Sequence, residues 1–366
     1  MQNATYTEMP RALPSSGTTI KSWILEQFHR SQSELIRKLS RSRSRIHFTF
    51  DLWSSPNHRA FIGVVAHWMD QTLKLHSTVL GMRRFQGRHT GENQAKHFWD
   101  IIKTYQITEK IGYFTLDNAS NNDTALQHIA KYLEELGLEF NPVQRRLRCF
   151  GHIINLTVKA FLWGTDADAF EIEIDSHREL LHESEELEAW RRKGPLGKLH
   201  NIISWISRSP QRRDRFEEKV QQVLGPNTKA LALIQGNTTR WGGDYNSLTQ
   251  AFDLREPLED FVASAIRRNE DGKHDTLSSS LQHDELCISD WDTLRDIMDI
   301  LEPFHHWQLK LQKKDHFGQL HDIFPAMDEL LGQLEEFKQL YESISRRHNT
   351  QHIRTSINAA WLVLNK

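Results

Sequence analysis

The 366-residue sequence predicts an α/β protein with a mixed sheet in its first part and a long all-helical region behind it. Two observations lead to this class. Between residues 46 and 149, short segments alternate apolar and polar side chains, or are apolar throughout, as strands do. From about residue 164 onward, apolar residues recur three and four positions apart, which is the spacing of amphipathic helices.

The composition excludes several classes of protein. The chain holds 46 Lys and Arg against 48 Asp and Glu, a formal net charge of -2, so any nucleic-acid binding has to use local basic patches. Only two cysteines occur, which rules out a disulfide framework. The sequence has no run of 18 apolar residues and no signal-peptide core, so we expect neither a membrane-spanning nor a secreted protein.

Residues 1–43 are expected to form a lead-in that is disordered at first. Over 20–40 it is expected to form one helix or a pair of helices, because apolar residues return every three or four positions. The segment 37–45 is rich in Lys and Arg. A phosphate clamp, a localisation signal and a solvated linker are all compatible with it.

The predicted sheet begins at Ile46. Ile46, Phe48 and Phe50 share one face of an alternating strand at 46–53. Two further strands follow as nearly continuous apolar runs. The expected elements of this part (44–163) are strands at 46–53, 61–69, 73–82, 112–117 and 145–149, and helices at 90–105, 120–136 and 152–163.

Residues 164–366 are expected to be a helical domain. Its first part, 166–192, is acid-rich with a helical pattern, and Ser209-Pro210 has the order of an N-cap and first helical residue. A polar, Ser-rich loop is expected at 269–285. The remaining predicted helices lie at 196–206, 210–224, 241–268, 290–313, 319–345 and 351–365.

Asp51 and Asp117 each lie at the end of a predicted strand and before a turn. The predicted order of three strands, a helix, a strand, a helix and a strand is that of a ribonuclease-H-like sheet. In such a sheet the first and fourth strands are neighbours, so the two carboxylates would meet at one edge of the sheet. Mg²⁺ and Mn²⁺ prefer carboxylate oxygens, and a pair of such ions can clamp the attacking and leaving oxygens of phosphoryl transfer. Judged by spacing alone, the alternative is that both aspartates start turns or cap helices.

Several segments resemble the hAT superfamily of cut-and-paste DNA transposases, and within it the Restless-like group of fungal elements. The segments follow one another in the same order as in that family and lie at residues 50–57, 63–68, 91–93, 112–123 and 148–156. The resemblance implies that Asp51 and Asp117 are the first two carboxylates of an Asp-Asp-Glu triad that binds Mg²⁺ or Mn²⁺. It further implies DNA recombination at transposon ends, in the nucleus, by a metal-dependent nuclease.

Two other motifs carry over from the resemblance. Cys149 and His152 match a Cys-x-x-His motif; zinc binding would need two further ligands that the spacing does not select, and a buried structural role is the alternative. Arg240 and Trp241 match an Arg-Trp element. The resemblance implies that Trp241 stacks on a flipped base and that Arg240 lies near a phosphate, while a core tryptophan at a helix start is the alternative.

The chain also departs from the family pattern. In the family, the catalytic Glu and a dimerisation segment follow the helical insertion, whereas this sequence ends at Lys366 within what resembles that insertion. No Cys precedes Cys149, so the zinc-finger module is not found either. We therefore expect either a truncated or decayed copy or a sequence that continues in a longer gene product. The third carboxylate cannot be assigned, and we expect little or no cleavage activity of this chain alone.

A non-catalytic protein that binds DNA or other proteins is the alternative to an enzyme. In that case Lys and Arg contact phosphates and give salt-dependent, weakly specific binding. The expected partners are DNA and a second copy of the chain, with no membrane and no small-molecule substrate; a helical scaffold for protein partners on 166–366 is a further reading. The basic residues proposed for DNA are Arg145, Arg146, Arg148, Arg208, Arg212 and Arg213.

Overall fold

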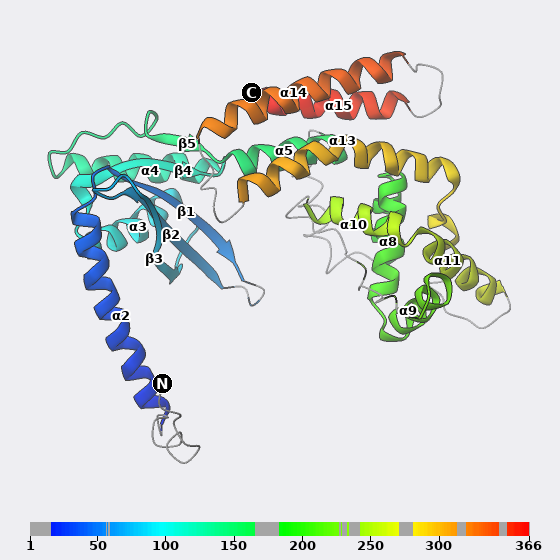
Figure 1. Ribbon diagram of the computed structural model, residues 1–366, viewed down its shortest axis with the longest axis horizontal. Helices are drawn as coiled ribbons and strands as arrows, with labels where there is room; N and C mark the ends of the chain where they lie inside the picture. The colour runs from blue at the N-terminus through cyan, green and yellow to red at the C-terminus, as the bar shows by residue number, and fades with distance from the viewer. Residues whose placement is uncertain are drawn as a thin grey trace. The chain divides into compact units, whose positions relative to one another are not determined.

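The computed structural model describes residues 16–55, 57, 59–164, 183–226, 228, 233, 242–270, 281–312, 320–343 and 350–365. The chain divides into two compact units, Met1–Cys149 and Phe150–Lys366, and Figure 1 labels most of their helices and strands. The first unit contains the sheet and the second is helical, which confirms the predicted α/β class.

Five strands form one mixed sheet in the order β3-β2-β1-β4-β5. The first three are joined as an antiparallel meander. β4 runs parallel to β1, and β5 runs parallel to β4, so the predicted pairing of the first and fourth strands is confirmed. The strands are β1 (Ile46–Ser54), β2 (Ala60–Met69), β3 (Leu75–Arg84), β4 (Ile111–Leu116) and β5 (Arg146–Arg148).

Helices α3 (Gly91–Tyr105) and α4 (Ser120–Glu134) share one apolar core with the strands. Phe98 of α3 packs edge-on against Phe48 of β1 and Phe114 of β4, with ring centroids 5.2 Å apart in both pairs. This aromatic cluster occupies one face of the sheet. Because side chains alternate along a strand, the residues between these phenylalanines point to the opposite face.

The first unit begins with α2 (Gly17–Ser40), one helix of 24 residues. Ser16 caps it by accepting a hydrogen bond from the Thr19 backbone N–H, and Leu39 near its end is buried. The helix predicted for 20–40 is therefore confirmed, with a start three residues earlier. The rest of the predicted lead-in, residues 1–15, lies outside the described residues.

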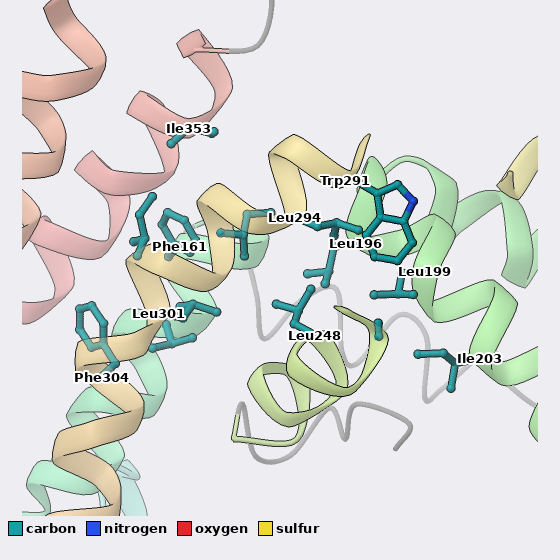
Figure 2. Close-up of a cluster of buried hydrophobic side chains, with 14 of the residues drawn as sticks. Phe161, Leu196, Leu199, Ile203, Leu248, Trp291, Leu294, Leu301, Phe304 and Ile353 are labelled. Carbon is teal, nitrogen blue, oxygen red and sulfur yellow. The ribbon is translucent and has the colours of Figure 1, made fainter. Parts of the chain in front are cut away.

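The second unit is built from helices around one extended core. Figure 2 shows Trp291 beside Leu196 and Leu199, three of the side chains that fill this core. The helices are α5 (Phe150–Trp163), α7 (Glu183–Arg191), α8 (Pro195–Ser207), α9 (Pro210–Leu224), α10 (Gly242–Asp253), α11 (Arg255–Glu270), α13 (Ile288–Gln312), α14 (Leu320–Ser343) and α15 (Thr350–Leu364).

The structure differs from the sequence reading in two places. Helix α5 groups with the helical unit because it packs against α15 and α13, whereas we placed it with the sheet. The single helix predicted for 241–268 is two helices that meet at Leu254. Pro257 favours this break, because proline is tolerated in the first turn of a helix but removes a backbone hydrogen bond in a helix interior.

Within the part of the chain that the structure describes, no helix combines the length and the apolar character needed to span a membrane.

Candidate functional site

The parallel register of β1 and β4 brings Asp51 and Asp117 to neighbouring positions. Phe48 is level with Phe114, and Thr49 is level with Thr115. Continuing this register by two residues places Asp51 level with Asp117 on the face opposite the phenylalanine cluster. Neighbouring strands lie about 4.8 Å apart, a separation at which two carboxylates can bind the same ion.

The turn after β4 fixes one oxygen of Asp117. Its Oδ1 accepts hydrogen bonds from the Ala119 backbone N–H, at 3.0 Å, and from the Asn122 side-chain amide. Arg146 donates to the Asp117 backbone carbonyl at 2.8 Å. The start of α4 therefore orients the carboxylate of Asp117, and β5 holds its backbone.

Asp51 is exposed, and its Oδ1 accepts a hydrogen bond from the Leu52 backbone N–H at 2.9 Å. The Oδ2 atoms of Asp51 and Asp117 form no hydrogen bond with the residues that the structure describes. Each aspartate thus has one oxygen held by the protein and a second oxygen available as a ligand. This donor chemistry suits Mg²⁺ or Mn²⁺, which take water and phosphate oxygens as further ligands.

The third ligand expected from the resemblance is not located. Among the described residues, no three His, Cys, Asp or Glu side chains come together as a metal site. The third carboxylate of the triad therefore stays unassigned, as it did in the sequence.

The three basic residues at β5 have different surroundings. Arg145 lies over the ring of Tyr113, 5.0 Å from its centroid, and the exposed Arg148 donates to Asn118 Oδ1 at 3.0 Å. The Arg146 side chain is only 5 % exposed and pairs with Asp123. Its burial, together with the positive charge of Arg148, lowers its pKa. Arg146 thus faces into the protein, which argues against the phosphate contact predicted for it.

The second basic group lies at the junction of α8 and α9. Arg208 pairs with Glu186 at 3.0 Å, and Arg213 donates to the Ser207 carbonyl at 3.1 Å while its side chain stays exposed. Arg212 covers the Trp205 ring at 4.3 Å, so part of its role is structural. Arg213 is the member of this group best placed to reach a phosphate.

The two remaining motifs are only partly described. The Cys149 N–H donates to the Leu116 carbonyl at 2.8 Å, which extends the pairing of β5 with β4, and the side chain is half-buried. His152 is half-buried in α5, in the other unit. The zinc role and the structural role of this pair both stay predictions. Arg240 and Trp241 lie outside the described residues.

Sequence reasoning missed a polar stack on the same face as Asp51. The Tyr113 ring stacks on His47, with centroids 5.6 Å apart, and the Tyr113 N–H donates to His47 Nδ1 at 3.1 Å. Gly112 makes the room, because a Cβ there would lie 2.8 Å from that nitrogen. The register shift of β1 on β4 that permits this contact has no signal in either strand alone.

This arrangement predicts an acid-sensitive strand pair. Burial lowers the pKa of His47, and the positive charge of Arg145 lowers it further. A histidine with a lowered folded-state pKa stabilises the fold fully above about pH 6.5 and loses that contribution as the pH falls through this value towards its folded pKa. We expect amide protection of 111–116, corrected for intrinsic exchange rates, to fall between about pH 7.5 and 5.5.

The matched variant is His47→Gln, because a glutamine carbonyl can accept the same hydrogen bond without titrating. Its protection factors should change less over the same pH interval, as measured by hydrogen exchange. An equal pH response of both proteins would show that another group controls this strand pair.

Comparison with known proteins bears on this geometry. Two family models match consecutive parts of the chain: the ZBED1 RNase-like domain over residues 49–139 and the ZBED1 RNase-like helical domain over residues 147–284. The first match covers the two aspartates and most of the sheet, and the second begins at β5. The fold and these matches define the class of protein as an RNase-like core followed by its helical domain.

Curated relatives agree. A Zea mays protein named as a candidate AC transposase is 30 % identical over 289 residues, which are 78 % of this chain and 32 % of that protein. The candidate transcriptional regulator tpeD of Talaromyces stipitatus is 24 % identical over 352 residues, 94 % of this chain and 38 % of that protein. The zinc finger BED domain-containing protein RICESLEEPER 2 of Oryza sativa subsp. japonica is 21 % identical over 320 residues, 84 % of this chain and 40 % of that protein.

The chain belongs to the hAT transposase family, because both family models and the AC transposase relatives match it in order. It spans about a third to two fifths of the length of the three relatives described above.

Proposed function

We propose that this chain is the metal-binding core and helical domain of a hAT-type transposase that cleaves DNA in the nucleus. The observation that carries the proposal is the neighbouring placement of Asp51 and Asp117 on two parallel strands of a chain in this family. The names of the AC transposase and BED zinc-finger relatives support DNA as the substrate.

In this proposal Asp51 and Asp117 hold Mg²⁺ or Mn²⁺. The bound ion would polarise a phosphate oxygen and favour ionisation of the attacking water. The protein contributes an oriented ligand, because the Ala119 N–H and the Asn122 amide hold Asp117 Oδ1. The carboxylate therefore needs little reorganisation when it binds the ion. The more exposed Asp51 supplies the second oxygen.

DNA binding is the second part of the proposal. Arg148 and Arg213 are exposed and keep their guanidinium groups at the surface, so they can contact phosphates. Arg240, Trp241 and a second copy of the chain remain further predicted participants.

We expect Arg148→Ala to weaken duplex DNA binding to a similar extent for every sequence. One lost phosphate contact should also lower the slope of log K against log salt by about 0.9. The measurement is fluorescence anisotropy between about 50 and 200 mM salt. Lys103→Ala is the control, because Lys103 is an exposed cation of α3 that pairs with Asp100. An unchanged slope for Arg148→Ala would remove this residue from the interface.

The experiment for the whole proposal is strand cleavage. The protein, in the longest form that its gene encodes, is incubated with DNA carrying the terminal repeats of the element and with Mg²⁺ or Mn²⁺. Metal-dependent nicking at the repeat ends that requires Asp51 supports the proposal. The absence of nicking in the presence of sequence-independent DNA binding contradicts it.

A non-catalytic DNA-binding regulator is the second candidate. One observation favours it: the relative that matches 94 % of this chain is named as a candidate transcriptional regulator. The same cleavage experiment separates the two candidates, because a regulator binds DNA without nicking it.

A further inference from the structure

An acidic groove lies between α13 and α14 in the helical unit, beyond residue 284, where the matched family models end. The two helices pack against each other and leave a space of about 710 Å³ between their exposed sides. The floor of this groove is apolar and consists of Pro303, Phe337 and Leu340. The Leu340 side chain is 49 % exposed, so a bound partner can cover it.

Carboxylates line both rims of the groove. Asp299 and Glu302 belong to α13, and Glu329 and Glu336 belong to α14. None of the four forms an ion pair with a residue that the structure describes. Among the lining residues, His306 is the one that can become positively charged. The groove therefore combines an apolar floor with uncompensated negative charge on both sides.

The negative potential extends into the protein. Burial raises the pKa of Tyr341, and the nearby charges of Asp296 and Asp299 raise it further. Burial likewise raises the pKa of Tyr245, with a contribution from Glu302. The rim carboxylates thus act on tyrosines of two different helices.

The backbone adds a further acceptor. Pro303 lies inside α13 and has no N–H, so the Asp299 carbonyl one turn earlier loses its helical donor. Both residues line the groove. The Asp299 carbonyl is therefore an acceptor that lacks its usual partner within the helix.

We propose that this groove binds a basic amphipathic helix of a partner protein. Apolar side chains of that helix would cover Pro303, Phe337 and Leu340, and its Lys or Arg residues would face the two rims. Along α14 the groove follows the stretch from Glu329 to Leu340, which at 1.5 Å per residue is about 16 Å, or three helical turns. Nucleic acid does not fit, because its phosphates would meet four carboxylates.

The probe is a fluorescein-labelled Lys/Leu peptide of about 14 residues with helical spacing, and its control replaces every Lys by Glu. We expect the Lys/Leu peptide to bind, with an affinity that falls as salt is raised, and the Glu/Leu peptide not to bind. The double variant Glu302→Arg and Glu336→Arg should weaken binding about tenfold or more, since it reverses charge on both rims. The control variant reverses Glu134 and Glu135, two exposed carboxylates at the end of α4, and should bind like the wild type.

A second variant tests the proposal independently, in case the double charge-reversal variant misfolds. Leu340→Gln changes an exposed floor residue. It should leave the circular dichroism spectrum unchanged and should also weaken binding of the Lys/Leu peptide. A photo-crosslinking version of the peptide should label 299–306 and 329–340. Equal binding by all variants, binding of the Glu/Leu peptide, or crosslinks confined to other helices would overturn the proposal.

Discussion

Replacing Asp51 or Asp117 by Asn should reduce metal-dependent DNA cleavage by more than about a hundredfold. Mutating a residue that hydrogen-bonds a metal ligand typically lowers metal affinity or activity about 10–100-fold. Mutating the ligand itself is expected to lower activity further. Asn keeps the size of the side chain but removes the negative charge that attracts a divalent ion. Because the two residues serve one site, the double variant should lose little beyond either single variant.

The measurement is the initial rate of nicking by the protein in the longest form that its gene encodes. Asp100→Asn is the control, because this exposed residue of α3 pairs only with Lys103 among the described residues. Its rate should match the wild type. Nicking that survives in both Asp51→Asn and Asp117→Asn would place the catalytic centre elsewhere in the protein.

Replacing Asp284 by Ala should destabilise the helical unit by about 3–5 kcal/mol, the cost typical of breaking a buried ion pair. Asp284 is only 2 % exposed and accepts two hydrogen bonds from Arg191, at 2.9 and 2.7 Å. Asn201 donates a third at 2.9 Å. These contacts join α7, α8 and the short turn before α13. Without the carboxylate, the guanidinium of Arg191 loses these two hydrogen bonds and keeps its pair with Glu188. The buried amide of Asn201 keeps its bond to the Leu187 carbonyl.

Denaturant unfolding, followed by the fluorescence of the tryptophans in this unit, measures the effect. The loss is a large part of the 5–15 kcal/mol that stabilises a typical domain, so the variant should be partly unfolded near 37 °C. Glu217→Ala, at an exposed position on α9, should stay within about 0.5 kcal/mol of the wild type. A change below about 1 kcal/mol for Asp284→Ala would mean that the network is solvated or replaceable.

The sheet could be predicted because its signals are local. Alternation at Ile46, Phe48 and Phe50 marks one buried face, and the order of strands and helices selects the pairing of β1 with β4. The same alternation puts Asp51 and Asp117 on the other face. The candidate site was therefore accessible from the sequence, although the residues that hold Asp117 in place were not.

The rest depends on contacts between distant parts of the chain. Asp284 lies 93 positions from Arg191, and no pattern along the sequence links them. The burial of Arg146 also has no local signal, because its partner Asp123 sits on another element and its neighbour Arg148 is exposed. A run of arginines therefore looked uniform in sequence but contains both structural and exposed members.

The most direct test of the central claim is isothermal titration of Mn²⁺ into the wild-type protein and into its Asp51→Asn and Asp117→Asn variants. If the two aspartates hold one ion, the wild type should bind Mn²⁺ and each variant should bind it at least about tenfold more weakly. Identical binding by all three proteins would contradict a shared metal site at the β1–β4 edge.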